Sequence, residues 1–428
     1  MPLDRPPPDR RPIVVGLVVG VLVLAASGAV YALNPPVEPP PEPRLDWRVE
    51  PAQPPFADPS AEEPKAKPRD PLDGFRWAQY GYSQDRNRHL PTREQLHPPF
   101  KRHWTWVGHV LLEFPPIIVG NRLFVLKNDA KLVALNRTTG RKVWSRRVGR
   151  LAASSPAFGD GRVYVTVLER AGVYAGRVAA LRAKDGRRLW SRDLPARSES
   201  SPVYDDGRVY FGSEDGGVYA LRARDGSIAW RFQAGGAVKG ALALADGRVY
   251  FGAYGGSVYA LRQRGGSLVW RSGAGGNFYS SPAVAFGRVY IGSTNGSMYA
   301  FSAADGHLSW SRGTGSYVYS SPAVAHVPDG TPAVYFGSYS GTFYALDARS
   351  GATLWSHADG GKISGAATVV GDVVYYSSWG NRDTTALGAR TGRTLWHTDR
   401  GAFNPVVSDG RRIYLTSLTA IAAYAPRR

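Results

Sequence analysis

The chain has 428 residues and no cysteine, which limits the chemistry that its side chains could carry out. A disulfide framework, a thiolate metal site and a cysteine nucleophile are therefore excluded. Acidic residues outside Asp-Gly turns are few, and the main ones are Glu113, Glu169, Asp193, Glu199, Glu214, Asp215, Asp359, Asp383 and Asp399. A calcium site needs several converging oxygen ligands. Only Glu214 and Asp215 are adjacent, and a solvated turn explains this pair better than a metal site.

Histidines, serines and glycine strings also form no recognisable catalytic set. The histidines after residue 100 lack the spacing of zinc ligands, and they are His103, His109, His307, His326, His357 and His397. Ser-Ser-Pro recurs from Ser154, Ser200, Ser280 and Ser320, so it marks the start of a repeated strand rather than a nucleophile. Gly273 to Gly276 precedes a strand and is read as a turn, not a phosphate-binding loop. We predict no catalytic, cofactor-binding or metal-binding residue, and no cofactor.

A repeat of about forty residues supplies the elements that would position any site. The segments Ser200–Trp230 and Ser280–Trp310 match over most of their length. Each unit ends in tryptophan, and these residues are Trp104, Trp144, Trp190, Trp230, Trp270, Trp310, Trp355 and Trp396. Four short runs of β-branched and aromatic residues, separated by glycine turns, fill each unit. This pattern predicts four antiparallel strands, which is one blade of a β-propeller.

The number of blades follows from how the ring closes. After Trp396, residues 402–424 supply only three strands, so one strand of the last blade is missing. The segment His103–Trp106 lies forty residues before Trp144 and can supply it. We therefore predict an all-β, eight-bladed propeller in which each tryptophan packs against the neighbouring blade. Seven blades would be correct only if the Trp104 strand lay outside the ring.

The amino-terminal region has a different character. The run from Ile13 to Leu33 is uncharged and long enough for the roughly 20-residue helix that crosses a bilayer. Arg5, Arg10 and Arg11 precede it, which predicts that residues 1–12 are a cytoplasmic tail and that the rest is exported. The alternative is a signal peptide cleaved near Val30-Tyr31-Ala32. We expect an uncleaved signal anchor at 13–33 and a single-pass membrane protein whose carboxy-terminal domain is extracytoplasmic.

Three further segments complete the predicted organisation. Residues 34–72 are rich in proline and charged residues, which predicts a disordered, extended stalk; a PxxP ligand for a partner domain is the less favoured interpretation. Residues 73–99 are expected to form a strap against the ring. Residues 100–428 are expected to form the propeller.

The repeats resemble the quinoprotein-like (PQQ-repeat) β-propellers. The resemblance rests on segments such as Ala220-Leu221…Asp225-Gly226…Trp230 and covers about 330 of the 428 residues. The family includes quinone-dependent alcohol dehydrogenases and the propeller lipoprotein of the outer-membrane barrel assembly machine. The segment from Trp77 to Gly81 resembles the lead-in of the dehydrogenases. Those enzymes hold the quinone with calcium, a carboxylate base, a stacking tryptophan and a vicinal cysteine pair, and this chain has no cysteine.

The two faces of the predicted ring carry different residues. With the strands of a blade lettered A to D in chain order, the D–A and B–C connections share one face, called here the loop face. Non-repeating aromatic and lysine residues gather there and predict a protein-binding surface. They are Lys239, Tyr254, Phe278, Tyr279, Tyr317, Tyr319, Tyr339, Lys362 and Trp379. The alternative is that several of these rings stack inward and fill the axis.

The opposite face, called here the turn face, carries the A–B and C–D turns and repeated arginines. One set follows Asp-Gly turns or their equivalent, at Arg162, Arg208, Arg248, Arg288 and Arg411, and another lies at Arg182, Arg222 and Arg262. The chain has a net charge of +19, and residues 1–99 carry 12 basic and 13 acidic residues, so all the excess lies beyond them. We expect a solvated, partly paired rim. The alternative is a platform for anionic lipid or envelope polymer, whereas nucleic acid is disfavoured.

These observations favour a non-enzymatic, membrane-tethered propeller that acts outside the cytoplasmic membrane. Its expected role is a protein-binding scaffold in envelope assembly or sensing. The alternative function is that of a quinone- and calcium-binding, dehydrogenase-like protein.

Overall fold

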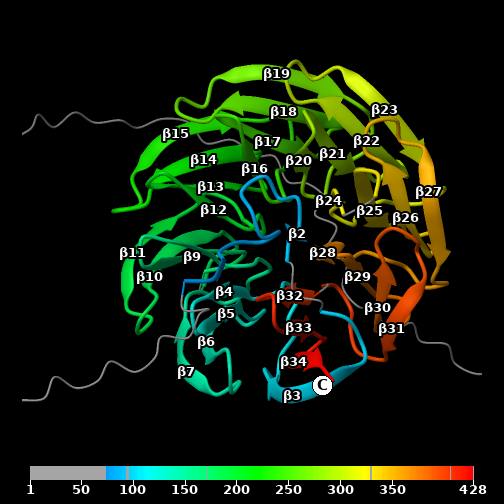
Figure 1. Cartoon of the computed structure of the whole chain (residues 1–428). Coiled ribbons are helices and arrows are strands. Elements are labelled where there is room, and N and C mark those ends of the chain that lie inside the picture. The colour runs from blue at the N-terminus through cyan, green and yellow to red at the C-terminus, as the bar shows by residue number, and fades with distance from the viewer. Residues whose placement is uncertain (1–73, 93–95, 171, 328–329, 405, 428) are drawn as a thin grey trace, which may run out of the picture. The chain divides into compact units, whose positions relative to one another are not determined.

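Eight β-sheets surround a common axis in the computed structural model (Figure 1). The structure describes residues 74–92, 96–170, 172–327, 330–404 and 406–427. All regular elements within these residues are strands, so the predicted all-β, eight-bladed architecture is confirmed. No helix in this part of the chain is long and apolar enough to cross a bilayer. The predicted segments 1–12, 13–33 and 34–72 lie outside the described residues.

Each blade is an antiparallel sheet of four strands, A to D from the axis outward. Blade 1 consists of β4 (Ile117–Val119), β5 (Arg122–Leu126), β6 (Lys131–Asn136) and β7 (Lys142–Arg147), and blade 2 of β8 (Ala157–Gly159), β9 (Arg162–Val167), β10 (Arg177–Arg182) and β11 (Arg188–Asp193). Blade 3 consists of β12 (Val203–Asp205), β13 (Arg208–Gly212), β14 (Gly217–Arg222) and β15 (Ile228–Gln233), and blade 4 of β16 (Ala243–Ala245), β17 (Arg248–Ala253), β18 (Ser257–Arg262) and β19 (Leu268–Gly273). Blade 5 consists of β20 (Ala283–Ala285), β21 (Arg288–Gly292), β22 (Ser297–Ser302) and β23 (Leu308–Gly313), and blade 6 of β24 (Ala323–Ala325), β25 (Ala333–Gly337), β26 (Thr342–Asp347) and β27 (Thr353–Ala358). Blade 7 consists of β28 (Thr368–Val370), β29 (Val373–Ser378), β30 (Asp383–Gly388) and β31 (Thr394–Thr398), and blade 8 of β32 (Val406–Ser408), β33 (Ile413–Thr416), β34 (Ala420–Pro426) and β3 (Phe100–Val107).

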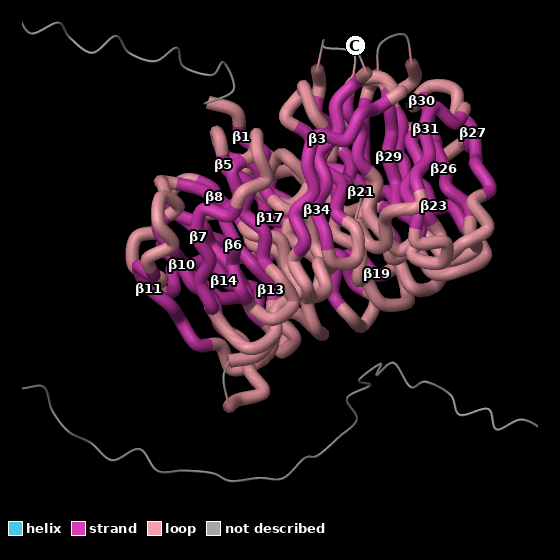
Figure 2. The backbone as a smooth tube through the Cα atoms, turned by 90° about the horizontal axis from the view of Figure 1, so that it is seen from below, coloured by secondary structure: helices cyan, strands magenta, loops and turns pink. Residues whose placement is uncertain are grey.

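The two middle strands of a blade form its core, and the outer strand is amphipathic. Strands β13 and β14 are buried along almost their whole length, because the blades on both sides cover them. In β15 only Trp230 is buried, and Ile228, Arg231 and Gln233 are exposed. The strands span the thickness of the ring, with connections at both faces (Figure 2).

The tryptophan at the end of each unit locks its blade to the next one. Seven of these indole N–H groups donate to a carbonyl in the C–D turn of the following blade, at 2.8 to 3.2 Å. The turn glycine lies directly against the indole ring. Gly226, for example, has a φ of +74°, and a Cβ atom there would lie 2.5 Å from the Trp190 ring. Trp396 instead packs edge-on against Phe100, at 5.3 Å.

The ring closes through a strand from the amino-terminal side of the propeller. β3 pairs antiparallel with β34, from Phe100 opposite Pro426 to Val107 opposite Ala420. The order β3-β34-β33-β32 completes blade 8, as the position of Trp104 predicted. Strand β34 is therefore paired on both sides, with β3 and with β33, which removes an open sheet edge.

A strap of residues 74–92 follows the inner strands of the ring. Its β1 (Arg76–Trp77) pairs with β4 of blade 1, and its β2 (His89–Leu90) pairs in parallel with β28 of blade 7. Between them, strap carbonyls accept hydrogen bonds from the inner edges of blades 2, 4, 5 and 6, through the N–H groups of Phe158, Leu244, Val284 and Val324. The strap thus runs around the axis and contacts blades far apart in sequence (Figure 1).

Candidate functional site

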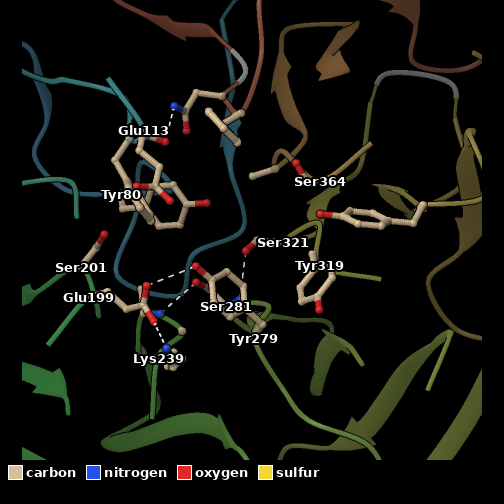
Figure 3. Close-up of a pocket in the computed structure, with 17 residues that line it drawn as sticks. Tyr80, Glu113, Glu199, Ser201, Lys239, Tyr279, Ser281, Tyr319, Ser321 and Ser364 are labelled. Carbon is tan, nitrogen blue, oxygen red and sulfur yellow. Dashed lines mark hydrogen bonds and ion pairs between the residues drawn. The ribbon is translucent and has the colours of Figure 1, made fainter. Parts of the chain in front are cut away.

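A cavity of about 240 Å³ lies on the ring axis, and we call it the axial cavity (Figure 3). Its walls come mainly from the D–A connections, which bring seven blades together, and from Tyr80 of the strap. Its lining residues are Tyr80, Glu113, Phe114, Glu199, Ser201, Lys239, Gly240, Ala241, Tyr279, Ser281, Tyr319, Ser321, Tyr339, Ser364, Ala366, Phe403 and Asn404. The strap lies next to this cavity, because four inner strands bond to it three residues after a lining residue, namely Ala241, Ser281, Ser321 and Ala366.

Two buried arginines hold the strap in place. Arg86 donates to the carbonyls of Leu242, Ser201 and Pro202 at 2.8 to 3.2 Å, and also to that of Tyr80. Arg88 donates to Pro322 and lies 4.5 Å from the centre of the Tyr80 ring. Both arginines have left-handed backbones, with φ of 60° and 54°. Burial lowers the pKa of Arg86 to about 9, and Arg88 adds to this effect.

An ion-pair network forms one wall of the cavity. The Lys239 ammonium lies 2.6 Å from Glu199 Oε1 and 3.1 Å from Glu214 Oε1, and the Tyr279 hydroxyl donates to Glu199 Oε2 at 3.3 Å. Burial alone would lower the pKa of Lys239, but the two carboxylates outweigh it and raise that pKa. Burial raises the pKa of Tyr279 well above its ordinary value, and the charge of Glu199 raises it further. At neutral pH this wall therefore holds a charged lysine and a neutral phenol.

Glu113 lies on the opposite side of the cavity from this network (Figure 3). Its Oε2 accepts a hydrogen bond from Asn128 at 3.0 Å, and the Asn404 amide donates to the Glu113 carbonyl at 2.6 Å. Burial raises the pKa of Glu113, and the neighbouring Glu199 carboxylate also raises it. Glu113 and Glu199 thus place two carboxylates at one cavity whose lining contains a single lysine, Lys239.

The predicted surface residues separate into two groups. Lys239, Tyr279, Tyr319 and Tyr339 line the axial cavity, as the inward-stacking alternative describes. The others lie around it: Lys362 and Tyr317 are exposed, Trp379 stacks on Phe403 at 4.5 Å, and Tyr254 lies 5.6 Å from the Lys239 ammonium. Burial raises the pKa of Tyr254 to about 12.

Phe278 differs from the expectation of a surface position, because its side chain is fully buried between blades. It fills the space left by Gly252, where a Cβ would lie 2.3 Å from the Phe278 Cβ. Val238 and Val318 pack in the same way against Gly212 and Gly292. Phe278 therefore occupies a repeated core position of the D–A connection rather than a position on the loop face.

The cavity is lined by side chains from one equivalent position of the repeat. An analysis of single residues does not detect this position. The residue nine positions after each tryptophan, or eight after Trp396, differs from blade to blade while its neighbours repeat. These residues are Glu113, Ala153, Glu199, Lys239, Tyr279, Tyr319, Ser364 and Asn404, and all except Ala153 line the cavity. Two residues further on, the position holds a small residue in most blades, including Ser201, Ala241, Ser281, Ser321 and Ala366. A variable position within a strict repeat was the available signal for this site.

The arginines of the turn face act largely within the protein. Arg208 donates to the carbonyl of Arg264 and Arg248 to that of Ala303, both at 2.6 Å, and these bonds connect neighbouring blades. Arg182 pairs with Asp185 of its own C–D turn. This repeated set therefore reinforces the ring as well as charging its rim.

The eight four-stranded blades and the tryptophans that join them define a β-propeller of the PQQ-repeat type. The family model described as outer membrane protein assembly factor BamB matches residues 101–232 and 214–427, so the chain belongs to this PQQ-repeat family. No curated protein matches the chain in sequence.

Solved structures with this fold include BamB and several dehydrogenases. BamB from Moraxella catarrhalis is 16% identical, with a TM-score of 0.63, over 77% of this chain and 99% of that one. A quinohemoprotein alcohol dehydrogenase from Pseudomonas putida HK5 is 16% identical, with a TM-score of 0.66, over 82% and 80%. A europium-containing methanol dehydrogenase is 13% identical, with a TM-score of 0.67, over 82% and 98%. At these identities the likeness establishes the fold alone.

The residues of the axial cavity do not fit the quinone that the dehydrogenases carry. Pyrroloquinoline quinone is a polycarboxylate, and here its carboxylates would meet Glu113 and Glu199. The only lysine of the lining, Lys239, is already paired with two carboxylates. Within the described residues, no group of three or more histidine, aspartate or glutamate side chains could hold a metal ion. The chemistry of this donor set disfavours a quinone site at this position.

Proposed function

We propose that the chain is a protein-binding scaffold, held at a membrane by residues 13–33 and presenting its loop face to a partner. The observation that carries this proposal is an aromatic cluster on the loop face of a rigid ring. The Tyr317 ring is 51% exposed and lies 5.7 Å from Tyr319 and 6.1 Å from Tyr339. Partly exposed tyrosines on a fixed scaffold are frequent anchors of protein interfaces.

Charge and family membership support the same function. Lys362 is exposed, and its ammonium lies 5.9 Å from the Tyr339 ring, so a cation borders the aromatic cluster. A partner surface with acidic and aromatic residues would complement this patch. The matching family is named for an assembly factor, which is consistent with a binding role.

The binding role is tested with the full chain, purified in detergent and presented to solubilised envelope proteins under crosslinking. We expect a saturable partner whose capture falls at least tenfold with Tyr317→Ala combined with Lys362→Ala. Phe286→Ala is the matched control, because Phe286 is 43% exposed in an A–B turn on the opposite face. Equal capture by both variants, or no saturable partner, would reject the proposal.

The membrane topology is tested with the cysteine-free background of the chain. Single cysteines introduced by Asp9→Cys and Ser60→Cys are exposed to an impermeant maleimide in intact cells. The proposal predicts labelling at position 60 only, and an uncleaved product that carries both positions. Labelling at position 9, or loss of position 9 from the mature protein, would refute the uncleaved anchor.

A further inference from the structure

Several hydroxyl groups around the axial cavity have protons that no described residue accepts. Ser201, Ser281 and Ser321 each use the Oγ atom to accept a backbone N–H from the preceding blade, at 2.9 Å. A serine oxygen that accepts in this way keeps its own proton for another acceptor. Ser364 Oγ is buried and makes no well-oriented hydrogen bond to a described residue, although it lies close enough to the Tyr339 phenol to oppose the rise in the pKa of that group. Buried polar groups are normally satisfied by protein or by water, so these hydroxyls are available to acceptors on a molecule that enters the cavity.

The same cavity also presents acceptors with unused capacity. A carboxylate offers about four lone-pair sites. Glu113 accepts one side-chain hydrogen bond, from Asn128, and Glu199 meets Lys239 and the Tyr279 hydroxyl. Donors and acceptors therefore face a single space, an arrangement that matches a ligand carrying several hydroxyl groups.

Aromatic rings supply the remaining walls. The rings of Tyr279 and Tyr319 lie 5.4 Å apart at 86° and form two perpendicular surfaces. Tyr80 and Phe114 form a second edge-to-face pair, at 5.8 Å. Flat apolar rings next to hydrogen-bonding groups suit a ligand with an apolar C–H face and a polar edge, which is the shape of a pyranose.

We infer that the axial cavity binds one ring of a neutral saccharide. Its volume of about 240 Å³ lies below the roughly 300–1,000 Å³ of sites for drug-sized ligands, so it suits a single ring. An anion would be repelled by Glu113 and Glu199. A cation would compete with Lys239 and would leave the serine protons without an acceptor. The site shares Tyr319 and Tyr339 with the aromatic cluster of the proposed interface, but Tyr317 and Lys362, the residues that test the interface, do not line the cavity.

The probes are neutral methyl hexopyranosides and N-acetylglucosamine, with choline and glucuronate as the charged comparisons. Binding to the full chain in detergent is measured by saturation-transfer difference NMR and by calorimetry. We expect at least one neutral sugar to bind, in the roughly millimolar to micromolar range, with its ring C–H protons nearest the protein. Preferential binding of choline or glucuronate, or binding of no sugar by a folded chain, would overturn the inference.

Matched pairs of variants separate a binding role from a structural one. Glu199→Gln should weaken the sugar at least tenfold, because hydrogen bonds to charged groups are the stronger ones. Glu214→Gln removes the other carboxylate next to Lys239, but Glu214 does not line the cavity, so sugar binding should persist. Likewise Tyr319→Ala should weaken the sugar and Tyr317→Ala should not. Equal effects within either pair would assign these residues a structural role and reject the site.

Ser364→Ala gives a readout that a purely structural role would not produce. The variant removes a buried hydroxyl that makes no well-oriented hydrogen bond to a described residue, so the free energy of unfolding should stay nearly equal or rise. Sugar affinity should nevertheless fall about threefold to tenfold. Unchanged sugar affinity in this variant would contradict the proposed contact.

Discussion

Two regions of the ring differ in how far their contacts repeat: the blades joined by the tryptophans, called here the frame, and the residues around the axis. In the frame, the same contact recurs: an indole N–H meets a carbonyl of the next blade in seven places. At the axis, equivalent positions carry different side chains in most blades, as Glu199, Lys239 and Tyr279 do. Repetition spreads stability over many equivalent contacts, whereas the axis concentrates it in a few contacts that no other blade duplicates.

The largest expected effect on the free energy of unfolding is that of Arg86→Ala, at the axis. Arg86→Ala leaves carbonyls of Tyr80, Leu242, Ser201 and Pro202 without their donor, inside the protein. Because each unsatisfied buried group costs about 1–3 kcal/mol, we expect a loss of roughly 5 kcal/mol in the free energy of unfolding. Urea denaturation measures it, and Arg224→Ala, at a side chain 77% exposed, is the control. A loss below about 2 kcal/mol would show that the strap is not a main support of the ring.

Removing one tryptophan tests the frame. Trp230→Ala deletes a buried indole and its hydrogen bond to Gln263, and we expect a loss of about 3 kcal/mol. The equivalent Trp270→Ala should cost a similar amount, because Trp270 makes the same bond to Ala303. Denaturation of the two single variants, compared under one condition, checks the equivalence. If one cost several times the other, the frame would not share its stability evenly.

The stability of the protein is expected to depend on pH through Glu113 at the axis. Burial raises the pKa of Glu113 above its ordinary 4.5, so the folded chain binds this proton more tightly than the unfolded chain. The contribution of Glu113 to stability therefore increases as pH falls through the raised pKa toward 4.5, and decreases as pH rises. Glu113→Gln removes this dependence, keeps an acceptor for Asn128, and should be more stable than the wild type at pH 7. A wild-type-minus-variant difference that does not vary with pH would contradict this assignment.

The smallest effect on stability is expected at the loop face. Tyr317 is half exposed, so Tyr317→Ala should change the free energy of unfolding by less than about 0.5 kcal/mol. Its partner binding should still decrease. Thermal denaturation together with the crosslinking assay measures both quantities, and a large loss of stability would instead make Tyr317 part of the frame.

The sequence predicts the frame well and the axis poorly, for a physical reason. The tryptophan spacing locates the blades and places Trp104 in the strand that closes the ring, because contacts between neighbouring blades follow the repeat. The contacts of Arg86 join residues more than one hundred positions apart, and no local pattern encodes them. Phe278 and Tyr279 are adjacent aromatic residues, and only comparison with Val238 and Val318 distinguishes the core position from the cavity position.

The strap has a mechanical consequence. A force applied to the chain ahead of residue 74 reaches the ring through β1 and then through bonds to blades 2, 4, 5, 6 and 7. Because these bonds follow one another along the strap, it must detach from several blades before the force reaches the β3–β34 closure. A tether attached at this end therefore pulls on the ring from within, and the propeller should withstand traction better than a ring held by its outer strand.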